Sequence, residues 1–239
     1  MATIADKICS FYDHLFIDVI LPNGYKFLNP FQENPETRLV MHQFYQRFYS
    51  DNQSRKFLIG INPSRHGAGV TGVPFTDTKR LKLACGIEMK NVHTHEVSSV
   101  FFYNMIEAYG GVDLFYKDVF VNSPFPLALV RETKNGWLNV NYYDDKMLFE
   151  SLKSVMIETL REFISWGLLT DEVYVMGKKN ALFIQKLNEK EKLVGKITVL
   201  EHPRYIQQYK SKSAILYLDK YLIALKKSPR KLLSEDLFM

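Results

Sequence analysis

A short apolar run that stops at Gly-x-Asn-Pro constrains the fold of this chain more than any other feature. The run covers residues 56–59, and Gly60, Asn62 and Pro63 follow it. An apolar run bounded by glycine and proline is typical of a buried strand in a parallel sheet. Ligands of such sheets bind beyond the carboxyl ends of the strands, so Asn62 is predicted to lie at a binding edge. An asparagine there can orient a water or a polar ligand, but it cannot take a proton from one.

Further apolar runs are predicted to be strands, and helical segments separate them. The runs cover residues 119–122, 172–176 and 196–200. Helices are predicted at residues 3–20, 38–49, 79–84, 96–108, 144–166 and 213–225 and after Gly177, with a hairpin around Asn135-Gly136 and loops at 30–35 and 62–78. Strands that alternate with helices indicate a mainly parallel sheet covered on both faces. The predicted fold class is therefore α/β, in three layers ordered α/β/α.

The size and charge of the chain limit the number of domains and the kinds of partner that it can have. It has 239 residues, 46% of them hydrophobic, which is enough for one sizeable core. No linker, repeat or low-complexity stretch interrupts it, so a single domain over residues 1–239 is predicted. The net charge of +5 and the pI of about 9.0 fit a polyanionic partner, although an ordinary basic protein has the same balance.

The cysteines and the apolar stretches exclude several classes of protein. Cys9 and Cys85 are too few for a disulfide framework or for an iron–sulfur cluster with four thiolates. No cluster of metal-ligating residues stands out, so neither a metal nor another cofactor is expected. No stretch approaches the roughly 20 apolar residues of a membrane span. The first residues lack the regions of a signal peptide. We expect a cytoplasmic protein in a reducing environment, with no membrane partner.

Four ordered segments carry motifs that occur together in one enzyme family. They are Gly-x-Asn-Pro at 60–63 with glycine-rich residues 67–69 and Thr-Gly-Val-Pro-Phe at 71–75, a helical segment at 96–102, a strand and loop at 118–127, and a strand ending in His-Pro at 199–203. These segments resemble the uracil-DNA glycosylase superfamily, and within it the single-strand-selective monofunctional (SMUG) type, closest to its second, bacterial branch. The resemblance covers about residues 55–210.

The resemblance implies a chemistry and a partner. It implies the uracil-DNA glycosylase fold and the hydrolysis of the bond between uracil and its sugar, as the first step of base excision repair. Such an enzyme flips the base out of DNA into a fitted pocket. It needs no metal, no cofactor and no lysine nucleophile. We expect a monomer that acts on single- or double-stranded DNA carrying deaminated bases, in the bacterial nucleoid.

The family motifs also imply catalytic roles for three residues. Asn62 would position the attacking water, His202 would donate a hydrogen bond to the base oxygen that gains charge, and Phe75 would stack on the flipped base. Each has a purely structural alternative. Asn-Pro often caps a turn, a histidine at a strand end can be satisfied by backbone, and a phenylalanine in a loop can belong to the core.

The remaining candidates contact the base or the DNA backbone. The amides around Ile61, Gly67 and Gly72 would approach the base or a phosphate, although loop glycines mostly serve turns. Arg204 and Tyr205 lie where relatives carry a loop that wedges into the duplex, and a plain surface loop is the alternative. Arg65, Lys178 and the basic segment 226–231 could contact phosphates, or could be solvated surface charges.

The position that reads the base edge departs from the family pattern. Where the SMUG type has an asparagine, alignment on Pro126 and Leu127 places Ser123, with Asn122 one residue earlier. Shifting the alignment by one residue would place Asn122 at this position instead. In a strand, however, neighbouring side chains point to opposite faces, so Asn122 would face away from the base and Ser123 is preferred. Serine is shorter and less discriminating than asparagine. It would leave room for xanthine or hypoxanthine beside uracil.

Two other functions are compatible with the same motifs. A mismatch-directed glycosylase on this fold shares Gly-Ile-Asn-Pro at 60–63, but usually lacks Thr-Gly-Val-Pro-Phe at 71–75. A lesion-binding module would keep the pocket without useful catalysis. The presence of both Asn62 and His202 favours an enzyme over such a module.

Overall fold

The parallel sheet at the centre of the molecule brings four strand ends to one edge. The computed structural model describes residues 2–225. The strands lie in the order β3 (Val119–Asn122), β2 (Lys56–Ile59), β6 (Leu169–Met176) and β7 (Lys196–Leu200), all parallel. In the register of the sheet Ile59 pairs with Asn122 and Val175, and Met176 pairs with Leu200. The residues that follow these pairs therefore meet at the same carboxyl edge.

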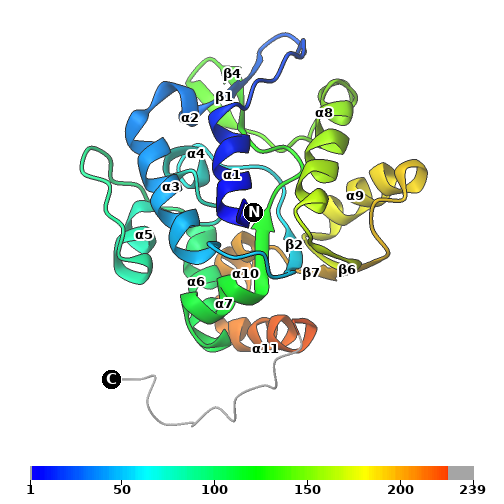
Figure 1. Ribbon diagram of the computed structural model, residues 1–239. Helices are drawn as coiled ribbons and strands as arrows, with labels where there is room; N and C mark the ends of the chain where they lie inside the picture. The colour runs from blue at the N-terminus through cyan, green and yellow to red at the C-terminus, as the bar shows by residue number, and fades with distance from the viewer. Residues whose placement is uncertain (1, 226–239) are drawn as a thin grey trace.

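Helices cover both faces of this sheet. In Figure 1, α8 (Lys146–Ser165) and α9 (Lys178–Glu191) lie on one side of it, and α3 (Pro35–Phe48) and α6 (Val97–Tyr109) lie on the other. The helix α1 (Ile4–Asp13) packs against α3, and its Phe11 also contacts Phe163 of α8. The remaining helices are α2 (Pro30–Glu33), α4 (Ala68–Thr71), α5 (Thr78–Cys85), α7 (Val112–Asp118), α10 (Pro203–Tyr209) and α11 (Ala214–Ala224), with one 3₁₀ turn at Ser211–Ser213. The prediction of a three-layer α/β/α fold is confirmed.

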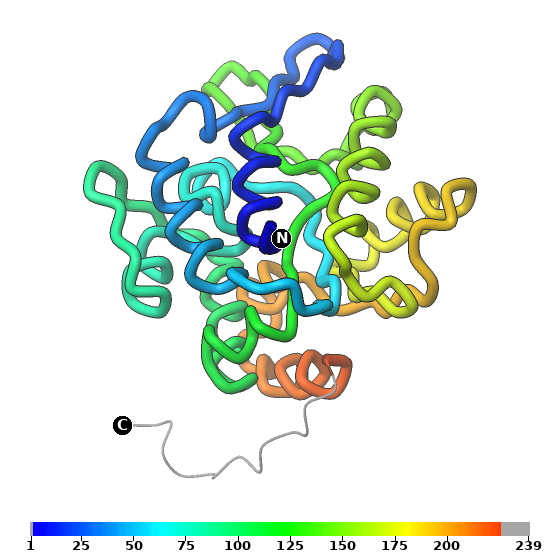
Figure 2. The backbone as a smooth tube through the Cα atoms, viewed as in Figure 1, coloured from blue at the N-terminus to red at the C-terminus, as the bar shows by residue number. Residues whose placement is uncertain are grey.

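A second, antiparallel sheet lies apart from the first. It joins β1 (Tyr25–Leu28), β4 (Ala128–Thr133) and β5 (Gly136–Asn139) in that order. Figure 2 shows the blue chain of β1 beside the green chain of β4, although about a hundred residues separate them in sequence. The hairpin predicted around Asn135-Gly136 is the turn between β4 and β5. The strands β1 and β4 were not predicted from the sequence.

The N-terminal segments differ from their prediction. The helix expected over 3–20 ends at Asp13, because the carbonyl of Leu15 accepts hydrogen bonds from the side chains of Asn29 and Gln32 (3.2 and 3.1 Å) and not from a following helical turn. The loop expected at 30–35 contains α2. Its start has an asparagine cap at Asn29 and a proline in the first turn, two signals that favour a helix.

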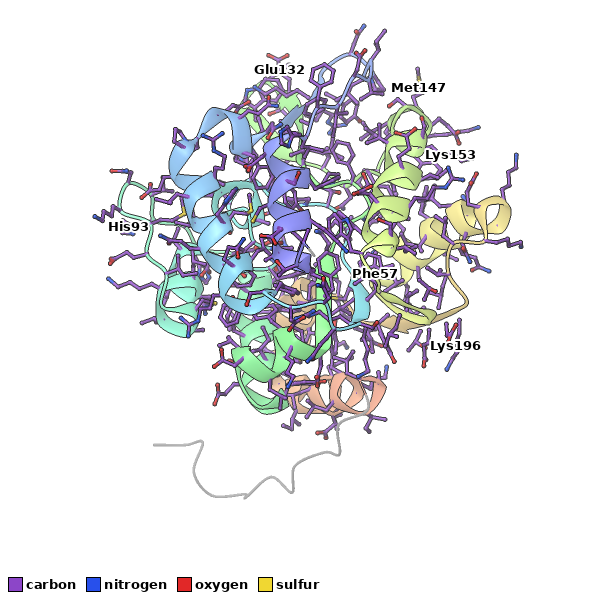
Figure 3. All side chains as sticks on the ribbon, viewed as in Figure 1. Phe57, His93, Glu132, Met147, Lys153 and Lys196 are labelled. Carbon is purple, nitrogen blue, oxygen red and sulfur yellow. The ribbon has the colours of Figure 1, made fainter. Side chains whose placement is uncertain are left out.

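The core surrounds the sheet, and most charged side chains lie outside it. Phe57 of β2 is fully buried at the centre of the molecule, whereas His93, Glu132 and Lys196 project from its periphery (Figure 3). Within residues 2–225, every helix is too short or too polar to cross a membrane. The basic segment 226–231, expected to attract DNA, falls outside the described residues.

A buried arginine holds the start of β2. Arg55 is fully buried, and its guanidinium donates to the carbonyls of Tyr116 (2.8 Å) and Phe48 (3.3 Å) and to Asp51 (2.8 Å). It therefore ties the strand that leads into Gly60 to the ends of α3 and α7.

Replacing Arg55 with methionine is expected to lower the free energy of unfolding by about 3 kcal/mol, because two buried carbonyls lose their donors. This loss of stability is small for the breaking of a buried ion pair, because the side chain of Asp51 is 40% exposed and water can solvate it once Arg55 is gone. Urea unfolding followed by circular dichroism would measure the change. The matched control is Arg161→Met, which breaks the surface pair with Glu191 and should cost less than about 1 kcal/mol. Equal losses in the two variants would contradict the prediction.

Candidate active site

A cavity of about 310 Å³ opens at the carboxyl edge of the parallel sheet, a volume within the range of small-ligand sites. Asn62, Ser123 and His202, which follow β2, β3 and β7, all line it. Ile61, Ser64, Phe75, Glu96, Ser98, Tyr143, Arg204, Tyr205 and Tyr209 are among the other lining residues. The fold thus gathers side chains from five segments of the chain around one space.

The amide of Asn62 is held in a single orientation. Its Nδ2 donates to the carbonyl of Val140 (3.1 Å), and its Oδ1 accepts from the N–H of Tyr142 (3.1 Å). Because donor and acceptor alternate along residues 140–142, exchanging the amide oxygen and nitrogen would break both bonds. The oxygen keeps a second lone pair for a ligand. This side chain is therefore fixed by the chain after β5, and does not serve as a helix cap.

A buried network supports that arrangement. The hydroxyl of Tyr142 donates to Oδ1 of Asn180 (2.5 Å), and Nδ2 of Asn180 donates to the carbonyls of Gly60 (2.9 Å) and Met176 (3.2 Å). Both side chains are completely buried. The network links the ends of β2 and β6 to the segment that holds Asn62. Sequence analysis missed both residues, since their partners lie far away in the chain.

Phe75 forms one wall of the cavity in a strained backbone conformation. Its φ of 56° is in the left-handed region, which a bulky residue rarely adopts. The ring stacks on Phe102 at a centroid distance of 4.8 Å, and the ring of His202 lies 5.6 Å away. Gly60 makes room for this wall, because a Cβ there would lie 3.1 Å from the Phe75 ring and 2.9 Å from Oγ of Ser123.

His202 presents a hydrogen-bond donor to the cavity. It precedes α10, and its Nδ1 accepts from the N–H of Arg204 (3.2 Å), so the proton of the neutral ring resides on Nε2. Nε2 makes no hydrogen bond within residues 2–225. Burial, together with the charge of Arg204, lowers the pKa of His202 to about 4. The ring is therefore a neutral donor at physiological pH.

Ser123 and Asn122 face in opposite directions, as alternation along a strand requires. The side chain of Asn122 is buried and exchanges hydrogen bonds with the hydroxyl of Tyr12 (2.9 and 3.1 Å). Its Oδ1 also accepts from the N–H of Ser123 (2.8 Å). Ser123 lines the cavity, and its hydroxyl makes no hydrogen bond within the described residues. The cavity is therefore lined by Ser123 and not by Asn122, which leaves Ser123 as the candidate for reading the base edge.

The segment after His202 is a helix and not the expected loop. Arg204 and Tyr205 lie in the first turn of α10 and line the mouth of the cavity. The ring of Tyr205 lies 5.7 Å from that of Tyr209, one helical turn later, and both are exposed. Two adjacent aromatic faces at the mouth of a cavity suit stacking against unpaired bases.

Comparison with known proteins agrees with this geometry. The sequence profile described as the uracil DNA glycosylase superfamily matches residues 47–226, about three quarters of the chain. The chain belongs to the uracil DNA glycosylase superfamily. Among solved structures, the crystal structure of wild-type Pedobacter heparinus SMUG2 matches with a TM-score of 0.92 and 43% sequence identity, over 95% of this chain and 98% of that one. A comparison with curated protein sequences finds no match.

The similarity to SMUG2 supports the SMUG type within the superfamily and confirms the resemblance inferred from the motifs. The match over nearly the whole of both chains extends well beyond the segments that carried the motifs.

Two glycines expected to approach the base of a superfamily substrate do not line the cavity. Gly72 is left-handed (φ 72°) and packs against Phe31 and Met41 in the core. Gly67 precedes α4, and any side chain there would collide with the carboxylate of Glu96. Both glycines serve the packing of the 61–78 segment, whereas Ile61 does line the cavity.

Two of the basic residues expected to bind DNA also lie outside the cavity. The N–H of Arg65 donates to Asn139 (3.2 Å), and its Nε donates to His66 (3.1 Å). Lys178 begins α9 and lines a separate groove together with Glu201 and Lys220. Any contact that these two cations make with DNA therefore takes place outside the cavity.

Proposed function

We propose that the protein is a monofunctional DNA glycosylase that hydrolyses the N-glycosidic bond of uracil in DNA, as the first step of base excision repair. The observation that carries this proposal is the convergence of Asn62, Phe75 and the Nε2–H of His202 on one cavity. Its lining contains no lysine, which agrees with hydrolysis by water in place of a Schiff base.

Each of the three residues has a distinct part in the proposed mechanism. The flipped base stacks on Phe75, which Phe102 holds in place. As the bond to the sugar breaks, negative charge builds up on the base oxygen, and the neutral His202 donates a hydrogen bond to it. Asn62 offers its free lone pair to a water and orients that water toward the sugar carbon.

The decisive experiment measures base release from single- and double-stranded oligonucleotides that carry one uracil. Alkali cleaves the abasic product, and a variant with both Asn62→Ala and His202→Ala is the control. Release by the wild type that disappears in the double variant supports the proposal. Tight binding to uracil-containing DNA without release would indicate a lesion-binding module, and release only from mismatched duplexes would indicate a mismatch-directed enzyme.

We further propose that Ser123 admits deaminated purines. Ser123→Asn is expected to reduce release of xanthine and hypoxanthine relative to uracil by about tenfold, because the larger amide occupies cavity volume and offers the donor and acceptor that match uracil. Competition assays with the three bases would measure the ratio. Ser154→Asn, on an exposed position of α8, is the matched control. An unchanged ratio in Ser123→Asn would contradict the prediction.

A further inference from the structure

One carboxylate in the cavity has no part in the mechanism described so far. Glu96 is the sole acidic side chain among the residues that line it. Its Oε2 is buried and accepts no hydrogen bond within residues 2–225. Leaving a buried carboxylate oxygen unpaired costs free energy, so such a group in a native protein calls for an explanation, and a catalytic role is one of them.

The surrounding structure holds this carboxylate in place. Glu96 precedes α6, and its own N–H donates to the buried Asp77 (3.0 Å), which also accepts from the hydroxyl of Ser99 (2.8 Å). On the other side the backbone at Gly67 packs directly against the carboxylate. The glycine-rich segment and the start of α6 therefore aim Glu96 into the cavity.

The proposed hydrolysis lacks a proton acceptor. The amide of Asn62 cannot act as a base, and its Nδ2 is already committed to the carbonyl of Val140. Nδ1 of His202 accepts from the N–H of Arg204, and its Nε2 carries a proton. A water that attacks the sugar must nevertheless lose one proton, and a positioned carboxylate is a common acceptor for it.

We infer that Glu96 is the general base that takes this proton, while Asn62 orients the same water. The inference rests on the proposed function. The water oxygen forms a bond to the sugar carbon C1′. The bond from C1′ to the base nitrogen breaks, and its electron pair leaves with the base. One water proton moves to the carboxylate of Glu96 and later returns to the released base, so that water and nucleotide become an abasic sugar and a neutral base.

The electrostatic environment raises the pKa of Glu96, which makes its carboxylate a stronger base than an ordinary one. Burial raises the pKa of Glu96 above its ordinary value, the hydroxyls of Ser98 and Ser64 lower it in part, and the negative charge of Asp77 raises it further. Arg204 is the cation that acts on it and favours the charged form. His202, in the same cavity, is neutral above about pH 4 and adds no charge there.

The test compares wild type with Glu96→Gln, which keeps the shape and removes the basic oxygen. Single-turnover release of uracil is expected to fall by about 10²-fold or more. The affinity for DNA carrying uracil on a 2′-fluorinated sugar, which resists hydrolysis, should stay within twofold. The wild-type rate should rise with pH as the raised pKa of Glu96 is passed, and this rise should vanish in the variant. Formate should restore part of the activity of Glu96→Ala.

Glu107→Gln, on the exposed face of the same helix, removes one negative charge and is the matched control, with a rate near that of wild type. Release by Glu96→Gln within threefold of wild type would overturn the inference alone. Equal loss of binding and folding stability in that variant would also overturn it and assign Glu96 a structural role. A wild-type protein that releases no base from any substrate would overturn the proposed function, and this inference with it.

Discussion

Replacing His202 with asparagine is expected to slow uracil release by about 10²–10³-fold, the usual cost of removing one donor to a developing negative charge. Asparagine is a favourable helix cap, so the variant keeps the start of α10 while its shorter side chain cannot reach the position of Nε2. Single-turnover kinetics on a uracil oligonucleotide would measure the loss. His66→Asn, at an exposed position near the cavity, is the control. A rate within fivefold of wild type would remove His202 from the mechanism.

The pH dependence provides a second measurement on the same residue. An ordinary histidine titrates near pH 6.5, but burial places the pKa of His202 at about 4, so the ring is neutral above that value. Protonation at low pH favours the unfolded chain, whose histidine has the higher pKa, and the stability contribution of the neutral ring is lost as pH falls from about 6.5 toward 4. An inflection of the rate near pH 6.5 that disappears in His202→Asn would contradict this assignment.

Replacing Asn62 with alanine is expected to reduce uracil release by about 10²-fold, because the attacking water loses its orientation. Asn62→Asp should be no faster than Asn62→Ala, although aspartate is a base. A carboxylate oxygen in place of Nδ2 would face the carbonyls of Val140 and Pro63, and that repulsion would displace the 140–142 segment. Asn91→Ala, on an exposed loop, is the control. An Asn62→Asp variant as active as wild type would show that orientation by the amide is dispensable.

Sequence analysis succeeded where local signals determine the structure. The strand over 119–122 and the strand over 196–200 agree residue for residue with β3 and β7, because each is an apolar run bounded by turn residues. The choice of Ser123 over Asn122 also followed from a local rule, the alternation of side chains along a strand. These elements were enough to place Asn62 and His202 at one edge.

The dipeptide Asn-Pro shows that the same local sequence can have different structural roles. It occurs at 29–30, 34–35 and 62–63, and the first two open α2 and α3 with the asparagine as cap. The third does not, because Val140 and Tyr142 bind the side chain of Asn62 from nearly eighty residues away. The proposed role of Glu96 could not be predicted from the sequence either. It depends on the packing of Gly67 against the carboxylate, a long-range contact that the sequence around α6 does not indicate.

The support of Asn62 by residues 140–142 has a consequence for inactivation by heat. This segment leaves β5, an outer strand of the small antiparallel sheet with much of its surface exposed, whereas β2 and β3 are buried in the core. Exposed hairpins open locally at a lower free energy than whole domains unfold. Because Val140 and Tyr142 are themselves buried, the opening would have to extend from β5 through them to free the amide of Asn62 while the parallel sheet stays intact. The temperature at which turnover ceases is then set by the hairpin, and the temperature at which the fold melts is set by the core.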